Sequence, residues 1–392
     1  RPRLMELITS TDDLAAACQA YASAPYVTVD TEFIRERTDW SQLCLVQMAR
    51  PEDPPEEGVL IDPLAKGISL DPLFELMGDT SVTKVFHASR QDIEIFYHLS
   101  GQIPLPLVDT QVVAMVCGHG DQVGYETIVR RIAKAQVDKS SRFTDWSRRP
   151  LSTKQLAYAL ADVTHLRVVH EALQEDLERR GRAHWVDEEM AILTSPATYV
   201  TDPDEAWRKV KARSTNPRLL AIVRELAKWR EITAQERDVP RSRVMKDDAL
   251  LEIASAKPKT PEEFGKLRLV QRDLRKPNVT AEILAAVVAG QQCPEARLPE
   301  IEPTPRRKEG SAAVADMLRV FLKARSDQLG VASKLIASSA DLDALAGEEN
   351  PDLPVLKGWR REAFGADALR ICAGEIGLAV GPQGLRVIEL SE

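Results

Sequence analysis

The stretch Tyr26–Met48, YVTVDTEFIRERTDWSQLCLVQM, opens with β-branched residues and then places two carboxylates two positions apart. Side chains alternate along a strand, so Asp30 and Glu32 share one face while Val27 and Val29 lie on the other. Like charges this close repel and raise each other's pKa. The stretch therefore predicts a strand whose carboxylates need a stabilising partner.

Four further β-rich runs follow, at residues 43–49, 58–62, 84–87 and 107–109. The first runs lie close together, as in a meander, whereas helical patterns over 89–99 and 110–117 separate the later ones, as in parallel crossovers. Ser152 with Gln155 predicts the start of a long helix, and Gly181 predicts its end. This part of the chain is predicted as an α/β domain, a mixed sheet with packed helices.

After residue 200 only helical patterns continue, apart from a possible terminal hairpin in GEIGLAVGPQGLRVIEL. The segments VPRSRVMKDDALLEIA and LGVASKLIASSADLDALA share a faint pattern that indicates a duplicated helical module. We predict a first domain over 1–200, a helical domain over 207–290, a Pro-rich linker over 291–310 and a second helical domain over 311–392.

Charge is distributed unevenly along this chain of 392 residues and net charge −8. Residues 207–290 carry 19 Lys and Arg against 11 Asp and Glu, a net +8, so the remainder is near −16. The five cysteines lie singly, no apolar run approaches membrane-spanning length, and no secretory leader is visible. These features predict a cytoplasmic protein with no membrane partner.

Two more carboxylates occur in helical patterns. Asp92 follows the strand at 84–87, and Asp162 lies four residues after Tyr158 on one face of the long helix. Several carboxylates without Cys or His suit hard cations such as Mg²⁺ or Mn²⁺, and a pair of these ions can activate water against a phosphodiester. Glycoside hydrolysis also uses paired carboxylates but needs no third and fourth acid.

The motifs VTVDTEF, FHASRQDIEIF and DKSSRFTDWSRRPLSTKQLAYALADVTHL resemble, in order and spacing, the three exonuclease motifs of ribonuclease D, a DEDD-superfamily 3′-to-5′ exoribonuclease. The resemblance spans about residues 5–200 and implies a ribonuclease H-like fold. Tyr158, four residues before Asp162, implies the tyrosine subtype.

The resemblance also implies the roles of the site residues. Asp30, Glu32 and Asp162 would hold one divalent cation beside the attacking water, and Asp30 and Asp92 would hold a second. Tyr158 would orient the water, since a phenol of pKa near 10 is a poor base at neutral pH. The products would be 5′-mononucleotides, released in 3′-end processing of structured RNA such as tRNA precursors.

Residues 207–290 resemble an HRDC domain, and their excess of positive charge favours phosphate contact. The negative 311–392 segment is expected to pack against the catalytic domain instead, and Trp146 is expected to anchor its loop rather than stack on bases. The candidate nucleic-acid-binding residues are Lys139, Arg142, Arg149, Arg208, Lys209, Lys211, Arg241 and Arg243.

Two competing functions stay open on the residues alone. One is a 3′-to-5′ DNA exonuclease with the same chemistry, because a metal site does not read the 2′-hydroxyl. The other is a catalytically silent nucleic-acid-binding scaffold, which the presence of all four acids and Tyr158 disfavours. RNA with a single-stranded 3′ end is the predicted partner, with DNA as the alternative, and we expect a monomer.

Overall fold

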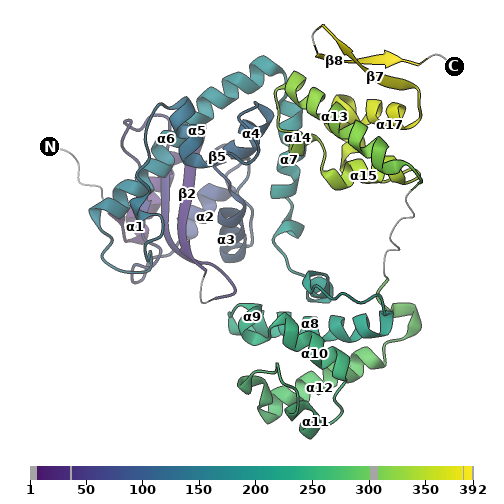
Figure 1. The fold of residues 1–392 in the computed structure, drawn as a ribbon. Coiled ribbons are helices and arrows are strands. Elements are labelled where there is room, and N and C mark those ends of the chain that lie inside the picture. Colours follow the sequence, from purple (N-terminus) through teal and green to yellow (C-terminus); the bar gives the residue numbers. More distant parts are fainter. Residues whose placement is uncertain (1–6, 36–37, 301–307, 383, 391–392) are drawn as a thin grey trace. The chain divides into compact units, whose positions relative to one another are not determined.

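The computed structural model describes residues 7–35, 38–300, 308–382 and 384–390. The chain forms two compact units. The first comprises residues 1–32, 43–195 and 304–392, and the second comprises 33–42 and 196–303. The predicted α/β domain is in the first unit, and Figure 1 shows the helices and strands of both.

A six-stranded sheet of order β1-β4-β3-β2-β5-β6 is the centre of the first unit. The predicted meander is confirmed, since β2, β3 and β4 are neighbours, and so are the crossovers, since β5 is parallel to β2 and β6 to β5. Strand β1 was not predicted, because two residues cannot show an alternating pattern. The strands are β1 Leu7–Ile8, β2 Tyr26–Ile34, β3 Gln42–Ala49, β4 Val59–Ile61, β5 Thr83–Phe86 and β6 Leu107–Asp109.

Helix α6, the predicted long helix, spans Thr153–Arg180 and is the longest helix of the described residues. Ser152 and Gln155 form the predicted capping box, and Gly181 closes the helix in the left-handed conformation that glycine adopts without strain. The other helices of the domain are α1 Thr11–Tyr21, α2 Asp71–Gly78, α3 Arg90–Ser100, α4 Thr110–Val116, α5 Tyr125–Ile132 and α7 Ala183–Leu193.

One face of β2 packs against α6. The Tyr26 hydroxyl donates to the Glu171 carboxylate (2.7 Å), and the Thr28 hydroxyl donates to the Val163 carbonyl (2.8 Å). Because side chains alternate, Asp30 continues this face towards the N-terminal half of α6. The alternation of the strand and the direction of the helix thus determine which residues meet at the site.

The C-terminal residues form helices that pack on the α/β domain within the first unit, as expected. The Trp359 ring stacks on Trp185 of α7 at 4.2 Å, and Arg360 pairs with Glu189 at 2.5 Å. The predicted terminal hairpin is also present. These elements are α13 Ser311–Leu329, α14 Ser333–Ile336, α15 Ser339–Gly347, α16 Gly358–Arg360, α17 Ala366–Cys372, β7 Ile376–Gly381 and β8 Gly384–Glu389.

The second unit is helical around an apolar core that includes Leu226, Leu250 and Ile283. Its helices are α8 Pro217–Arg237, α9 Arg241–Val244, α10 Asp247–Ala256, α11 Pro261–Gly265 and α12 Pro277–Gln291. Residues 301–307 of the predicted linker lie outside the described residues. Across the part of the chain that is described, no helix has the length and apolar character needed to cross a bilayer.

The repeated sequence pattern corresponds to a repeated local structure. Helices α8 and α13 each end at a left-handed residue, Asp238 and Gly330, and a four-residue helix follows, α9 or α14. The next residue is extended in both copies, Met245 with φ −156° and Ala337 with φ −152°, and a longer helix begins shortly after it. The fold is therefore an α/β domain followed by two related helical modules.

Candidate active site

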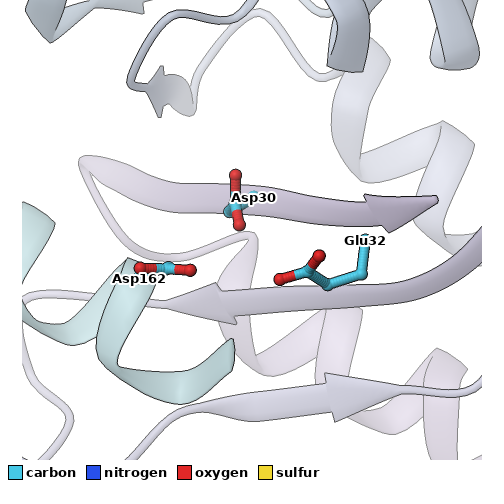
Figure 2. Close-up of side chains that lie close together, drawn as sticks. All are labelled: Asp30, Glu32 and Asp162. Atoms are coloured by element: carbon cyan, nitrogen blue, oxygen red, sulfur yellow. The ribbon is translucent and has the colours of Figure 1, made fainter. Parts of the chain in front are cut away.

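Three carboxylates meet where β2 approaches α6. Asp30 and Glu32 lie on β2 and Asp162 lies on α6, and one oxygen from each lies within 4.8 Å of the others (Figure 2). All three side chains are half-buried. Protein therefore shields each of them on most sides, while part of each side chain remains accessible to solvent.

Asp92 lies beside this cluster but is not one of its three members. It is in the first turn of α3, is 6% exposed, and accepts a hydrogen bond from the Thr31 hydroxyl of β2. Burial raises the pKa of Asp92, and the Asp30 charge raises it further. Of the four predicted acids, the structure thus brings three together and places the fourth within electrostatic reach of Asp30.

Burial, together with neighbouring charges at Asp30 and Glu32, raises the pKa values of the clustered carboxyls when no cation is bound. Burial and the neighbouring charges of Asp30, Asp162 and Asp92 raise the pKa of Glu32 to about 10. Burial raises the pKa of Asp162 to about 7, against a hydrogen bond from Tyr158. Burial and the Asp162 charge also raise the pKa of Asp30. A divalent cation is the partner that lets such carboxylates ionise together, because it supplies the missing positive charge.

Tyr158 lies one turn before Asp162 on α6, and its hydroxyl donates a hydrogen bond to that carboxylate. Burial and the Asp162 charge raise the pKa of the phenol above its usual value. The hydroxyl therefore stays protonated at neutral pH and acts as a hydrogen-bond group rather than a base.

Gln47 of β3 was not predicted as a site residue. Its side chain is fully buried, and its amide nitrogen donates to Oδ2 of Asp30 at 2.7 Å. This bond favours the ionised form of Asp30 and opposes the effect of burial. The available signal was a lone polar residue within the apolar run LCLVQMA of a central strand.

The loop before α6 carries the three basic residues predicted to contact phosphate. Burial raises the pKa of both Glu32 and Asp162, and the Arg142 charge counteracts this rise at both, so Arg142 lies near the cluster. Arg149 forms a bidentate pair with Asp62 (2.7 and 2.8 Å) and holds the loop to the sheet. The Lys139 side chain lies outside the described part of the structure.

Trp146 of this loop is 2% exposed, and its ring centroid lies 6.1 Å from that of Tyr158. The prediction that Trp146 anchors the loop by packing is therefore confirmed. Its position also braces Tyr158 from one side.

The predicted basic residues of the helical unit are all exposed. Arg208 pairs with Glu205, and the Lys209 amine donates to the Thr201 hydroxyl at 3.2 Å. Arg241 and Arg243 are on the short helix α9, and Lys211 follows the 3₁₀ helix Pro203–Lys209. Exposure makes these cations accessible to a phosphate backbone, but it does not by itself assign them a ligand.

Comparisons with known proteins agree with this architecture. A family model described as 3′-5′ exonuclease matches residues 5–178, and a model described as HRDC domain matches residues 219–287. Ribonuclease D of Jannaschia sp. (strain CCS1) is 55% identical, with 98% of this chain and 99% of the relative covered. Ribonuclease D of Nitrobacter hamburgensis is 50% identical, with 96% and 97% covered.

The crystal structure of Escherichia coli RNase D, an exoribonuclease involved in structured RNA processing, matches with a TM-score of 0.81 and 30% identity. The match covers 95% of this chain and 99% of that chain. Fold, acidic cluster and matched models define a 3′-to-5′ exonuclease that carries an HRDC domain. The chain belongs to the ribonuclease D family and is a 3′-to-5′ exoribonuclease, as its motifs predicted.

The family depends on divalent metal, and the donor set here fits such an ion. The three clustered side chains offer only carboxylate oxygens, the ligands that Mg²⁺ and Mn²⁺ prefer. The pKa values of all three carboxyl groups are raised, so the surrounding protein does not supply enough positive charge to stabilise them in the ionised form.

Proposed function

We propose that Asp30, Glu32, Asp92 and Asp162 hold two divalent cations, Mg²⁺ or Mn²⁺, for hydrolysis of the terminal 3′ phosphodiester of RNA. The supporting observation is the convergence of Asp30, Glu32 and Asp162 within 4.8 Å. When bound, such ions supply charge neutralisation at the phosphate and lower the pKa of water. The products are 5′-mononucleotides.

The residues of the chain then have separate tasks. The ligand oxygens of Asp30 and Asp162 lie within 4.8 Å of each other, and Asp92 accepts a hydrogen bond from the Thr31 hydroxyl and lies within electrostatic reach of Asp30. Tyr158 stays protonated, so its hydroxyl orients the attacking water by hydrogen bonding. Arg142, close to Glu32 and Asp162, is the cation of the loop best placed to contact a phosphate oxygen.

We infer that the substrate is structured RNA with a single-stranded 3′ end, such as a tRNA precursor. The exposed basic residues of the helical unit support this, because sequence-independent affinity for RNA comes mainly from phosphate contacts. The proposed contacts are Lys139, Arg142, Arg208, Lys209, Lys211, Arg241 and Arg243, while Arg149 has a competing anchoring role at Asp62.

The test is hydrolysis of matched single-stranded RNA and DNA with Mg²⁺, with Mn²⁺ and with EDTA. Asp162→Asn should lower the rate by at least about 100-fold while the fold is retained by circular dichroism. Asp187→Asn, at an exposed acid of α7, is the matched control and should retain activity. Full activity of Asp162→Asn would refute the assignment, and preferential cleavage of DNA would refute the substrate.

We also propose that the chain works as a monomer in the cytoplasm, with domain boundaries at 1–200, 207–290, 291–310 and 311–392. No disulfide occurs among the described residues, which suits a reducing compartment. Sedimentation analysis tests the monomer, and limited proteolysis tests the linker, which should be cut within 291–310 first.

A further inference from the structure

Phe143 leaves its aromatic ring almost entirely in water. The residue is 91% exposed, whereas Trp146 of the same loop is 2% exposed. Burying a phenylalanine side chain contributes about 1.5–3 kcal/mol, so the folded chain leaves that stabilisation unused at this position. A single exposed apolar residue needs no explanation by itself, so the significance of Phe143 depends on its position in the loop that precedes α6.

The exposed ring is carried by an ordered loop. Ser141 is 3% exposed, and the Thr144 hydroxyl donates to its carbonyl at 2.8 Å. The amide of Gln155, in the first turn of α6, donates to the Thr144 hydroxyl at 3.1 Å. Contacts on both sides of Phe143 therefore hold it in place, which lowers the entropic cost of binding against its ring.

Arg142 covers one face of that ring, with its guanidinium carbon 5.3 Å from the ring centroid. Phe143 lies three residues before Trp146, whose ring centroid is 6.1 Å from that of Tyr158, so the Arg142–Phe143 pair is on the loop that borders the acidic cluster. Proteins that bind single strands combine cations for the phosphates with aromatic faces for the bases. Here both groups occur in consecutive residues.

Resting on the proposed function, we propose that Phe143, backed by Arg142, forms a stacking subsite for an unpaired nucleobase at the 3′ end of the RNA. The face of the ring opposite Arg142 receives the base, while the guanidinium remains available to the neighbouring phosphate. Every base has a π-face, so the subsite accepts any sequence.

Three variants distinguish base stacking from an unspecific apolar contact. Phe143→Ala removes the ring, Phe143→Leu keeps apolar volume without a π-face, and Phe143→Trp keeps the π-face. The readout is kcat/KM on single-stranded RNA, both unmodified and with an abasic residue at each of the last three positions in turn. Val380→Ala, at another highly exposed apolar side chain (86%), is the control and should leave kcat/KM unchanged.

The Ala and Leu variants should each lose about 5- to 100-fold in kcat/KM, and Trp should stay near wild type. On the RNA that lacks the base bound by Phe143, the kcat/KM of the wild type should fall to that of Phe143→Ala. The kcat/KM of Phe143→Ala should be no lower on that RNA than on unmodified RNA. Stabilisation by Mn²⁺ should be equal in all proteins, because no proposed metal ligand is changed. A kcat/KM of Phe143→Leu equal to that of the wild type would refute stacking. An equal loss of kcat/KM for Phe143→Ala on unmodified RNA and on every abasic RNA would also refute it. Failure of wild type to cleave any RNA would instead refute the proposed function.

Discussion

The amide of Gln47 donates a hydrogen bond of 2.7 Å to Oδ2 of Asp30, while the Gln47 carbonyl oxygen is buried with no hydrogen-bond partner among the described residues. Burying the Gln47 carbonyl oxygen without a hydrogen-bond donor costs free energy. The bond orients Asp30 and favours its ionised form. Gln47 is therefore a positioning residue for the carboxylate that both proposed cations share.

Gln47→Leu should weaken the apparent affinity for Mn²⁺ by about 10- to 100-fold, the effect typical of groups that support a ligand. Without the donor, the pKa of Asp30 rises further, and protons compete better with the cation. The measurement is the Mn²⁺ dependence of hydrolysis at pH 7 and at pH 9. Higher pH should recover part of the loss. A defect of equal size at both values would indicate a packing effect instead.

Glu32→Gln should separate metal binding from the stability of the metal-free protein. Burial and three neighbouring acids raise the pKa of Glu32 to about 10, so its carboxyl is neutral at pH 7 and glutamine resembles it. The midpoint of thermal unfolding in EDTA should change by less than about 2 °C. The rise in this midpoint that Mn²⁺ causes in the wild type should be lost. An equal rise in both proteins would show that Glu32 is not a ligand.

The stability of the metal-free protein should fall as pH rises. Burial raises the folded-state pKa of Asp162 to about 7 and that of Glu32 to about 10, both above the unfolded values near 4. The folded chain therefore binds more protons than the unfolded chain across this window, and its free energy of unfolding decreases from about pH 4 upward. Urea unfolding between pH 5 and pH 9 in EDTA measures the decline. The triple variant Asp30→Asn, Glu32→Gln, Asp162→Asn should show a weaker dependence of the free energy of unfolding on pH.

The sequence predicts best where local chemistry agrees with the fold. The β-rich runs, the capping box at Ser152 and the stop at Gly181 act over a few residues, and the structure has them where they were predicted. Helices α1, α2 and α5 were not predicted: α2 and α5 have only eight residues each, whereas α1 was missed although Ser10 caps its start. The repeat of α8–α10 in α13–α15 was visible only as a faint pattern, yet it appears clearly in the backbone.

The site residues likewise divide into those that the sequence predicted and those that it did not. Motif spacing identified the acids and Tyr158, but the meeting of β2 with α6 depends on contacts between residues more than 130 positions apart, such as Thr28 with Val163. Gln47 and Phe143 were missed for a related reason. Their roles come from what their neighbours leave unsatisfied or exposed, and one sequence does not record that.

Lys84 should be essential for stability, although we assign it no role in binding metal or RNA. Its side chain is fully buried in β5, and its amine donates to the carbonyls of Asp79 (2.5 Å), Val82 (2.7 Å) and Leu105 (2.6 Å). Lys84→Met would leave three acceptors without this donor and should destabilise the fold by about 3 kcal/mol or more. Lys323→Met, at an exposed lysine of α13, should change the free energy of urea unfolding by less than about 0.5 kcal/mol.

Trp359→Ala should loosen the C-terminal helices from the α/β domain. The Trp359 ring is 1% exposed, stacks on Trp185 at 4.2 Å, and its backbone amide donates to Glu188 at 3.2 Å. Removing a buried tryptophan side chain costs about 3–5 kcal/mol, and much of this cost falls on the packing between the helices and the domain. Unfolding should then separate into two transitions, the earlier one detected by protease cleavage within residues 311–392. Trp359→Phe keeps an aromatic partner for Trp185 and should retain one transition. Identical unfolding of the Ala and Phe variants would show that the stack does not hold the helices in place.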